Sequence, residues 1–307
     1  SRKKFYSLNA ELELTPFPVP FTPRENSYTR IFEAEEGAFW AFNKQSFYLV
    51  ESGELTKSLK INSSVFDKSH FFLKAHQNYL YYASEDGLGQ INIHTGDAKM
   101  LFPNLKEIKF LEVFNHQLWI GDSGAGLWVA ELDEEKGVQS AEAVLEEVSI
   151  SSVIQDSEGN FWVATYGQGL YFLPANSEKI EVLNEDNGLG NAALESVLAT
   201  NDKIWIGNAR GELRYIQGDR IRRIDMADGL SDRLNRIIGI DELSTGQLIL
   251  ATDKGTFLWD GDGFFQILDE PTKALYLHAE EELILSTSFG VVEIPLKCLL
   301  DNAKPGV

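Results

Sequence analysis

The side chains that most often carry catalysis do not form a recognisable motif in this 307-residue chain. No two histidines have the spacing of metal ligands on one strand. The single cysteine, Cys298, has only Lys297 as a basic neighbour, so we expect an inert thiol. No phosphate loop, hydrolase nucleophile motif or kinase motif is present. We therefore predict no catalytic residue, no metal site and no cofactor. The five histidines are His70, His76, His94, His116 and His278.

Two acidic motifs have alternative functional interpretations. Asp260–Gly263 (Asp-Gly-Asp-Gly) is similar to the start of a calcium loop, but the downstream bidentate glutamate is missing. We expect a turn between two strands there. Asp156–Trp162 resembles the Asp-box hairpin of sialidase propellers. A sialidase would need several such boxes, an arginine cluster and an acid/base pair, and only one clear box exists. We therefore expect this hairpin to be structural.

The side chains that could contact a ligand follow the predicted second strand of each repeat, where the turns are expected to converge. They differ from one repeat to the next, so we predict ligand contacts from this set: Asp122, Tyr166, Asn208, Arg210, Asp253 and Phe289. Four tryptophans instead recur at one position of the second strand. They are Trp40, Trp119, Trp162 and Trp205. Recurrence at this period predicts packing between repeats rather than a platform for sugars.

The elements that position these residues follow from a repeated motif. Asp156–Tyr171 reads as a turn, an apolar strand, a glycine turn and another strand, and weaker copies occur along the whole chain. The second residue of each apolar strand falls at positions 40, 81, 119, 162, 205, 249 and 284. A period near 40 residues with several short strands per unit is typical of a propeller blade. Seven such positions predict seven blades.

We therefore predict an all-β fold: a single seven-bladed β-propeller over residues 1–307, with four-stranded antiparallel blades. The last unit offers only three strands, whereas Ser7–Leu14 alternates between polar and apolar residues. We expect an N-terminal strand over residues 5–14 to close the last blade, and Thr15–Pro23 to be a stiff connector. The predicted blade cores lie near 29–60, 71–102, 110–145, 151–184, 193–225, 236–268 and 274–296.

Charge restricts the partners of the chain. Its 47 acidic and 27 basic residues give a net charge of −20, which repels nucleic acid and anionic lipid. The window 203–236 contains eight lysines and arginines, against six acids when the adjoining Asp202 is counted. It is a weak candidate for an anionic ligand or partner, and outward-facing residues on one strand explain it almost as well.

No apolar run approaches the ~20 residues that span a bilayer, and the sequence at residue 1 does not read as a signal peptide. We expect the chain to make no membrane contact of its own. It is soluble as it stands or is a soluble portion of a longer protein.

Together these motifs resemble a known repeat. Asp156–Leu170, with the connector Asp186–Leu189, is similar to the two-component regulator propeller repeat. Ile204–Gly211 and Asp228–Leu230 are a good match, and other repeats are partial. The resemblance implies the periplasmic sensor region of hybrid two-component histidine kinases of the Bacteroidetes type. It implies a non-catalytic domain that binds a small molecule, a glycan or a protein and can form a homodimer, with any kinase outside this chain.

Other functions stay open. The chain could be a protein-interaction scaffold, in the periplasm or in the cytoplasm, with no signalling role. A propeller lyase or glycosidase is disfavoured, because the sequence shows no histidine pair or acid pair of the kind that such enzymes place at the channel. A reading frame encoding a signal peptide, a membrane helix and a kinase around this chain would favour the sensor.

Overall fold

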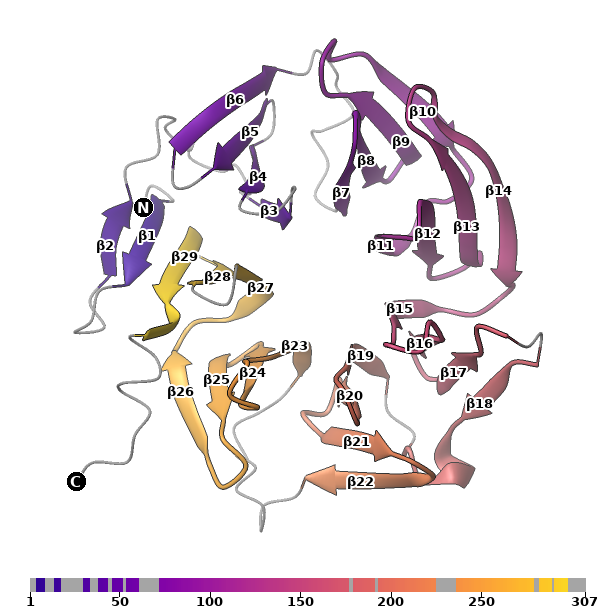
Figure 1. Cartoon of the computed structure of the whole chain (residues 1–307), viewed down its shortest axis with the longest axis vertical. Coiled ribbons are helices and arrows are strands. Elements are labelled where there is room, and N and C mark those ends of the chain that lie inside the picture. Colours follow the sequence, from indigo (N-terminus) through magenta and orange to yellow (C-terminus); the bar gives the residue numbers. More distant parts are fainter. Residues whose placement is uncertain are drawn as a thin grey trace. The chain divides into compact units, whose positions relative to one another are not determined.

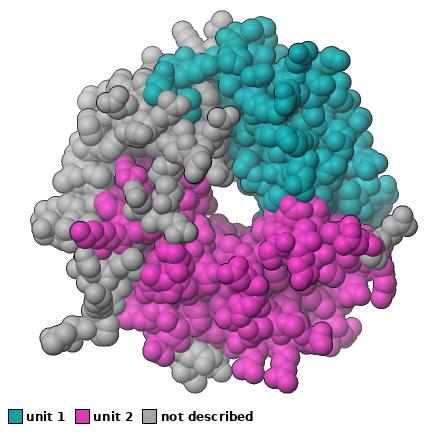
Figure 2. Space-filling view, viewed as in Figure 1, with its two compact units in different colours: residues 1–3, 19–151 teal, residues 4–18, 152–307 magenta. Residues whose placement is uncertain are grey.

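A computed structural model of the chain describes residues 4–8, 14–17, 30–33, 38–43, 46–51, 54–60, 72–176, 179–190, 193–224, 236–278, 282–288 and 290–297. The regular structure in these residues is almost entirely β-strand, and Glu185–Asn187 (η2) forms a 3₁₀ turn. The chain divides into two compact units, one of residues 1–3 and 19–151 and one of residues 4–18 and 152–307 (Figure 2).

The unit of residues 19–151 contains three four-stranded antiparallel sheets, each built from consecutive strands (Figure 1). The first holds β3 (Arg30–Glu33), β4 (Ala38–Asn43), β5 (Ser46–Glu51) and β6 (Glu54–Lys60). The second holds β7 (Leu73–His76), β8 (Tyr79–Ser84), β9 (Gly87–Asn92) and β10 (Ala98–Phe102). The third holds β11 (Ile108–Phe114), β12 (Gln117–Asp122), β13 (Gly126–Asp133) and β14 (Gly137–Leu145).

The unit that contains residues 152–307 has three further sheets of the same kind. The first holds β15 (Ile150–Gln155), β16 (Phe161–Thr165), β17 (Leu170–Leu173) and β18 (Glu181–Leu183). The second holds β19 (Leu194–Ala199), β20 (Ile204–Asn208), β21 (Leu213–Gln217) and β22 (Arg220–Ile224). The third holds β23 (Ile237–Glu242), β24 (Leu248–Thr252), β25 (Gly255–Trp259) and β26 (Phe264–Leu268). Its last sheet contains β27 (Thr272–His278), β28 (Glu282–Thr287) and β29 (Gly290–Pro295), with β1 (Lys4–Leu8) and β2 (Leu14–Phe17) beside them.

The burial of the strands explains their sequences. The second strands β8, β20 and β24 are buried at every residue, as expected where both faces of a strand are covered, which is why they read as continuous apolar runs. The fourth strand β22 is mostly exposed and carries three arginines. Within each unit, the first strand of one sheet contacts the first strand of the next: β3 with β7 and β7 with β11, then β19 with β23 and β23 with β27. Each four-stranded sheet is thus a blade, and the fold is an all-β propeller.

Apolar clusters join neighbouring blades. Trp205 is 3% exposed and lies in one cluster with Ile237, Leu248 and Trp259 of the next blade, with 5.4 Å between the two indole centroids. Trp119 is also buried. Trp162 packs against a cluster that contains Ile204 and Ile206 of the next blade. The predicted packing between blades is therefore confirmed for Trp205 and Trp162, whereas the Trp40 side chain lies outside the described residues.

One glycine position recurs because the backbone requires it. At the start of β13, Gly126 has a φ of 90°, and a Cβ there would lie 1.9 Å from the carbonyl oxygen of Leu145 in β14. At the start of β25, Gly255 has a φ of 130°, and a Cβ would lie 2.1 Å from the Leu268 carbonyl. The corresponding residue of the Asp156–Tyr171 motif is Gly169, where φ is 90° and a Cβ would lie 2.3 Å from the Leu183 carbonyl. This position combines a positive φ with close approach of the fourth strand, and both exclude a side chain.

Six sheets match the predicted four-stranded antiparallel blade, and the last sheet does not. It has five strands in the order β2-β1-β29-β28-β27, and β1 joins β29 in parallel, with Phe5 opposite Val291. The predicted closing strand over residues 5–14 was wrong in extent, because β1 ends at Leu8 and β2 begins at Leu14. These two strands pair antiparallel, so alternation across a hairpin was misread as one strand.

The start of the predicted proline connector is a strand instead. Thr15, Pro16 and Phe17 belong to β2, the edge strand of the last sheet. An edge strand can accommodate Pro16 because one of its sides needs no N–H donor.

Candidate functional site

Two of the predicted ligand contacts complete the turn after the second strand of their blade. Asp122 is 3% exposed, and its carboxylate accepts the N–H groups of Glu107, Gly124 and Ala125 at 2.9, 2.8 and 2.8 Å. Asn208 is 2% exposed. It accepts the N–H groups of Arg210 and Glu212, both at 2.9 Å. These hydrogen bonds shape the turn from within.

The same structural position carries a hydroxyl in other blades. Thr165 Oγ1 donates to the carbonyl of Gly169 at 2.6 Å, and Thr252 Oγ1 donates to the carbonyl of Gly255 at 2.8 Å. Ser84 and Thr287 make the equivalent bond. In the blades whose side chains the structure describes here, the last residue of the second strand is therefore a short polar residue that bonds to the turn after it.

Other predicted residues come together with Glu195, which the sequence analysis did not single out, and with Arg236, the last base of the arginine-rich window 203–236. Tyr166 follows β16, and Asp253 follows β24. Between them along the chain are Glu195, the second residue of β19, and Arg236, immediately before β23. Arg236 Nη2 donates to Glu195 Oε1 at 2.8 Å, and the Arg236 backbone N–H donates to Asp253 Oδ1 at 3.1 Å. We call these four residues the Tyr166–Arg236 cluster.

The cluster holds its arginine in place. The Glu195 side chain is only 7% exposed, while that of Arg236 is 48% exposed. Because guanidinium has five N–H donors in a fixed plane, one bond to Glu195 orients the group and leaves donors toward solvent. Tyr166 is 36% exposed. Burial and the nearby Glu195 carboxylate raise the pKa of the Tyr166 phenol, while Arg236 opposes that rise. The oriented guanidinium can bind a planar anion. The exposed Tyr166 ring, which lies within electrostatic range of Arg236, can contact a flat apolar face of a ligand.

The spacing of successive blades creates the cluster. Glu195 and Arg236 are 41 residues apart, and so are Ser196 and Ile237, where Ser196 Oγ donates to the Ile237 carbonyl at 2.9 Å. Both pairs join neighbouring first strands at one repeat period. A signal existed in the sequence: Glu195 is an acid inside an apolar first strand, and a base follows it after one period.

The arginine-rich window is partly neutralised. Glu212 accepts from Arg223 Nη1 at 3.1 Å, Arg214 Nη2 at 3.3 Å and Asn208 Nδ2 at 2.7 Å. Burial works to raise the pKa of Glu212, but these hydrogen bonds and positive charges outweigh it and lower the pKa. Arg210 is exposed, and no described carboxylate pairs with it.

The Asp156 hairpin is structural, as predicted. Its carboxylate accepts the indole N–H of Trp162 at 2.9 Å, the backbone N–H groups of Glu158 and Asn160, and the Asn160 amide. Burial acts to raise the pKa of Asp156, but these donors outweigh it and lower the pKa. The Asp260 carboxylate likewise accepts the N–H groups of Asp262 and Gly263 in a turn between β25 and β26.

The structure brings two histidines together that the sequence kept apart. The His76 and His116 rings are 5.6 Å apart, while His94 Nε2 contacts Asn78 Oδ1 at 3.0 Å. Among the described residues, no group of three or more histidine, cysteine, aspartate or glutamate side chains is placed to hold a metal ion. Phe289 and Cys298 lie outside the described residues.

The comparisons with known proteins agree with a propeller built from this repeat. The fold places the chain in the class of all-β propellers with four-stranded antiparallel blades. The predicted repeat is confirmed, since residues 145–167 match the family described as two component regulator propeller. No curated protein matches the chain. In the part of the chain that the structure describes, no helix is long and apolar enough to cross a membrane.

Solved structures share the fold at low identity. The extracellular domain of a putative hybrid two component system from B. thetaiotaomicron has a TM-score of 0.68 and 17% identity, covering 87% of this chain and 38% of that one. A second such domain from the same organism gives 0.61 and 13%, covering 87% and 40%. A catalytically inactive virginiamycin B lyase from Staphylococcus aureus gives 0.66 and 10%, covering 87% and 94%. The chain thus spans less than half the length of the two-component domains.

Proposed function

We propose that this chain is a non-catalytic sensory propeller, the extracytoplasmic sensor portion of a two-component signalling protein. The Tyr166–Arg236 cluster supports this most directly, because it presents an oriented cation and an exposed ring at one end of the inner strands. The ligand is a small molecule or glycan with an anionic or hydrogen-bond-accepting group. The two-component repeat and the fold of bacterial two-component sensor domains support the signalling role.

The proposal includes an architecture. The six four-stranded blades and the sheet of β27–β29, β1 and β2 form a single seven-bladed propeller over residues 1–307. Leu283, Leu285 and Val292 of the last sheet share an apolar cluster with Leu258 of the preceding blade, which supports a seventh blade. The chain resides in the periplasm, and ligand binding changes how two copies associate, which biases a kinase outside this chain.

Ligand screening against matched variants tests the site. Thermal shift with a library of glycans and small anions should give a hit that raises the melting temperature, since a ligand for the native state stabilises it. Tyr166→Ala and Arg236→Lys should each weaken that ligand by about tenfold, the size expected for losing one charge-assisted or stacking contact. Arg236→Lys keeps a positive charge beside Glu195, so the variant should remain folded.

The control is Arg220→Ala, which removes an exposed arginine of β22. It should leave ligand affinity unchanged. If Tyr166→Ala and Arg236→Lys bind as tightly as the unsubstituted chain while remaining folded, the cluster is not the ligand site. If ligand affinity falls equally in all three variants, the loss is not specific to the cluster and the ligand does not bind at this site.

A further inference from the structure

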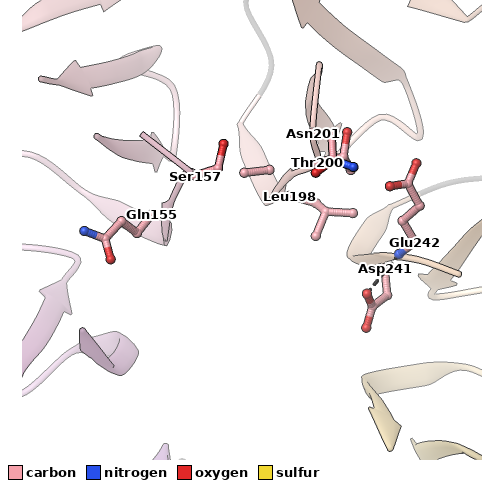
Figure 3. Close-up of a pocket in the computed structure, with 8 residues that line it drawn as sticks. Gln155, Ser157, Leu198, Thr200, Asn201, Asp241 and Glu242 are labelled. Atoms are coloured by element: carbon pink, nitrogen blue, oxygen red, sulfur yellow. Dashed lines mark hydrogen bonds between the residues drawn. The ribbon is translucent and has the colours of Figure 1, made fainter. Parts of the chain in front are cut away.

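A cavity lies at the end of the inner strands that is opposite to the Tyr166–Arg236 cluster. It has a volume of about 300 Å³ and is lined by the ends of β15, β19 and β23 and by the turns that follow β15 and β19 (Figure 3). Its lining residues are Gln155, Ser157, Leu198, Ala199, Thr200, Asn201, Asp241 and Glu242. Glu195 lies near the start of β19, and Leu198 and Ala199 lie at its end, so this pocket is separate from the Tyr166–Arg236 cluster.

The acidic side chains that line the pocket favour a cationic ligand over an anionic one. Two carboxylates, Asp241 and Glu242, line the pocket, and none of its lining residues is basic. The lysine of the neighbouring turn, Lys203, is 3.8 Å from Asp202 and lies over the Trp205 ring instead. Because the whole chain also carries −20, an anion would be repelled from this pocket. None of the lining residues is aromatic, so the pocket lacks the flat surface on which sugars commonly stack.

The hydrogen bonds of three lining side chains define which of their atoms donate and which accept. Thr200 Oγ1 donates its proton to the Lys203 carbonyl at 3.2 Å, which leaves the hydroxyl oxygen as an acceptor. The Gln155 amide nitrogen donates to the Gly159 carbonyl at 3.2 Å, within its own hairpin. Asp241 Oδ1 accepts the backbone N–H of Glu242 at 2.9 Å, which fixes the direction of that carboxylate.

The pocket therefore offers acceptors from separate blades. Figure 3 shows Gln155 and Ser157 on one side and Thr200, Asn201 and Glu242 on the other. Among these groups the carboxylates of Asp241 and Glu242 are charged and only accept hydrogen bonds, and a protonated amine has the opposite charge, three donors and no acceptor. We propose that this pocket binds a small protonated amine, with the carboxylates of Asp241 and Glu242 and the hydroxyl oxygen of Thr200 as acceptors.

Calorimetric titration with 1,4-diaminobutane tests the proposal, and 1,4-butanediol is the neutral probe of equal length. The diamine should bind and the diol should not. Glu242→Gln and Asp241→Asn keep the shape of the side chain and remove the charge. Each should weaken the diamine by about tenfold, the loss expected for one charge-assisted hydrogen bond. Thr200→Val should weaken it less, because a neutral acceptor is lost.

The matched control is Asp202→Asn, an acid of the turn after β19 that does not line the pocket. It should change diamine affinity by less than about twofold, as expected for a screened surface charge. Absence of saturable diamine binding in the millimolar range, equal binding of the diol, or an equal loss in Asp202→Asn and Glu242→Gln would each overturn the proposal. Arg236→Lys should leave diamine binding intact, so failure of the Tyr166–Arg236 site and failure of this one are distinguishable.

Discussion

Replacing Asp156 by alanine tests how the best-preserved repeat stabilises its blade. The side chain accepts two backbone N–H groups, from Glu158 at 3.0 Å and Asn160 at 2.9 Å. It also accepts the Asn160 amide and, at 2.9 Å, the Trp162 indole N–H. Asp156→Ala removes all of these acceptors at once. A hydrogen bond to a charged group contributes about 1.5–3 kcal/mol where it is buried, and Asp156 is only half-buried. We therefore expect a loss of about 3 kcal/mol in the free energy of unfolding.

Asp260→Ala is the matched control, because the Asp260 carboxylate accepts only two backbone N–H groups in a turn of the same unit. It should cost about 1 kcal/mol. The difference between the two variants then reports the bonds to Trp162 and Asn160. Urea unfolding followed by tryptophan fluorescence measures the free energy of unfolding of both variants. In a thermal scan, Asp156→Ala should lower the melting temperature by roughly 5–10 °C. If the two variants lie within about 0.5 kcal/mol of each other, the side-chain donors contribute nothing and the reasoning fails.

The pH dependence of the stability difference between Asp156→Ala and the unsubstituted chain gives a second check. The pKa of Asp156 is lowered in the folded chain, so its stabilisation is complete at pH values well above the ordinary pKa of 3.8. That stabilisation is lost as pH falls through the lower, folded-state pKa. The stability gap between Asp156→Ala and the unsubstituted chain should therefore be full at pH 7 and shrink in acid. A gap that stays constant down to acid unfolding would contradict the role of the carboxylate.

Three further predictions concern other contacts. Burial and the neighbouring Glu282 raise the pKa of Glu293 to about 7, so the folded chain holds a proton that the unfolded chain releases and should lose stability as pH rises from about 4.5 to 7; Glu293→Gln should remove that slope and be the more stable chain at pH 8. Gln90, 7% exposed, accepts the Val138 N–H at 3.2 Å; Gln90→Leu should cost about 2–3 kcal/mol in urea unfolding, because that N–H is left unpaired. Gly126→Ala should cost about 3 kcal/mol or more in the same assay, since a Cβ would lie 1.9 Å from a carbonyl oxygen.

Each of these has a control in the chain. Glu142→Gln, on an exposed position of β14, should leave the pH slope unchanged. Gln139 is exposed, so Gln139→Leu should cost little. The nearest atom to a Cβ at Gly124 is 3.6 Å away, so Gly124→Ala should be tolerated. A pH slope that persists in Glu293→Gln, or equal costs within either the glutamine pair or the glycine pair, would count against the corresponding argument.

The repeat made the blades predictable, because second strands buried on both faces leave continuous apolar runs such as Leu248–Thr252. Strand ends were less predictable. The alternation of polar and apolar residues from Ser7 to Leu14 is compatible with one long strand and also with a hairpin. In the hairpin Leu8 lies opposite Leu14, so both residues belong to the same face of the sheet, as they would in one strand. The Glu195–Arg236 pair escaped notice because its members are 41 residues apart, and only the packing of two first strands makes them neighbours.

Residues near the end of the second strand differ between repeats for two reasons that sequence alone does not separate: some close the turn, and others are exposed or position a neighbouring blade. The residue that ends each second strand differs, being Ser84, Asp122, Asn208 or Thr252 among others, yet each side chain supplies an oxygen that bonds to the turn after it. These residues differ in type, but each provides the side-chain oxygen that the backbone of the turn needs as a hydrogen-bond partner. Variation one residue later is different. The Tyr166 side chain remains 36% exposed, and Asp253 positions the backbone of Arg236. A search for ligand contacts in a propeller of this kind should therefore set aside the residue that closes the turn and examine the residue that follows it.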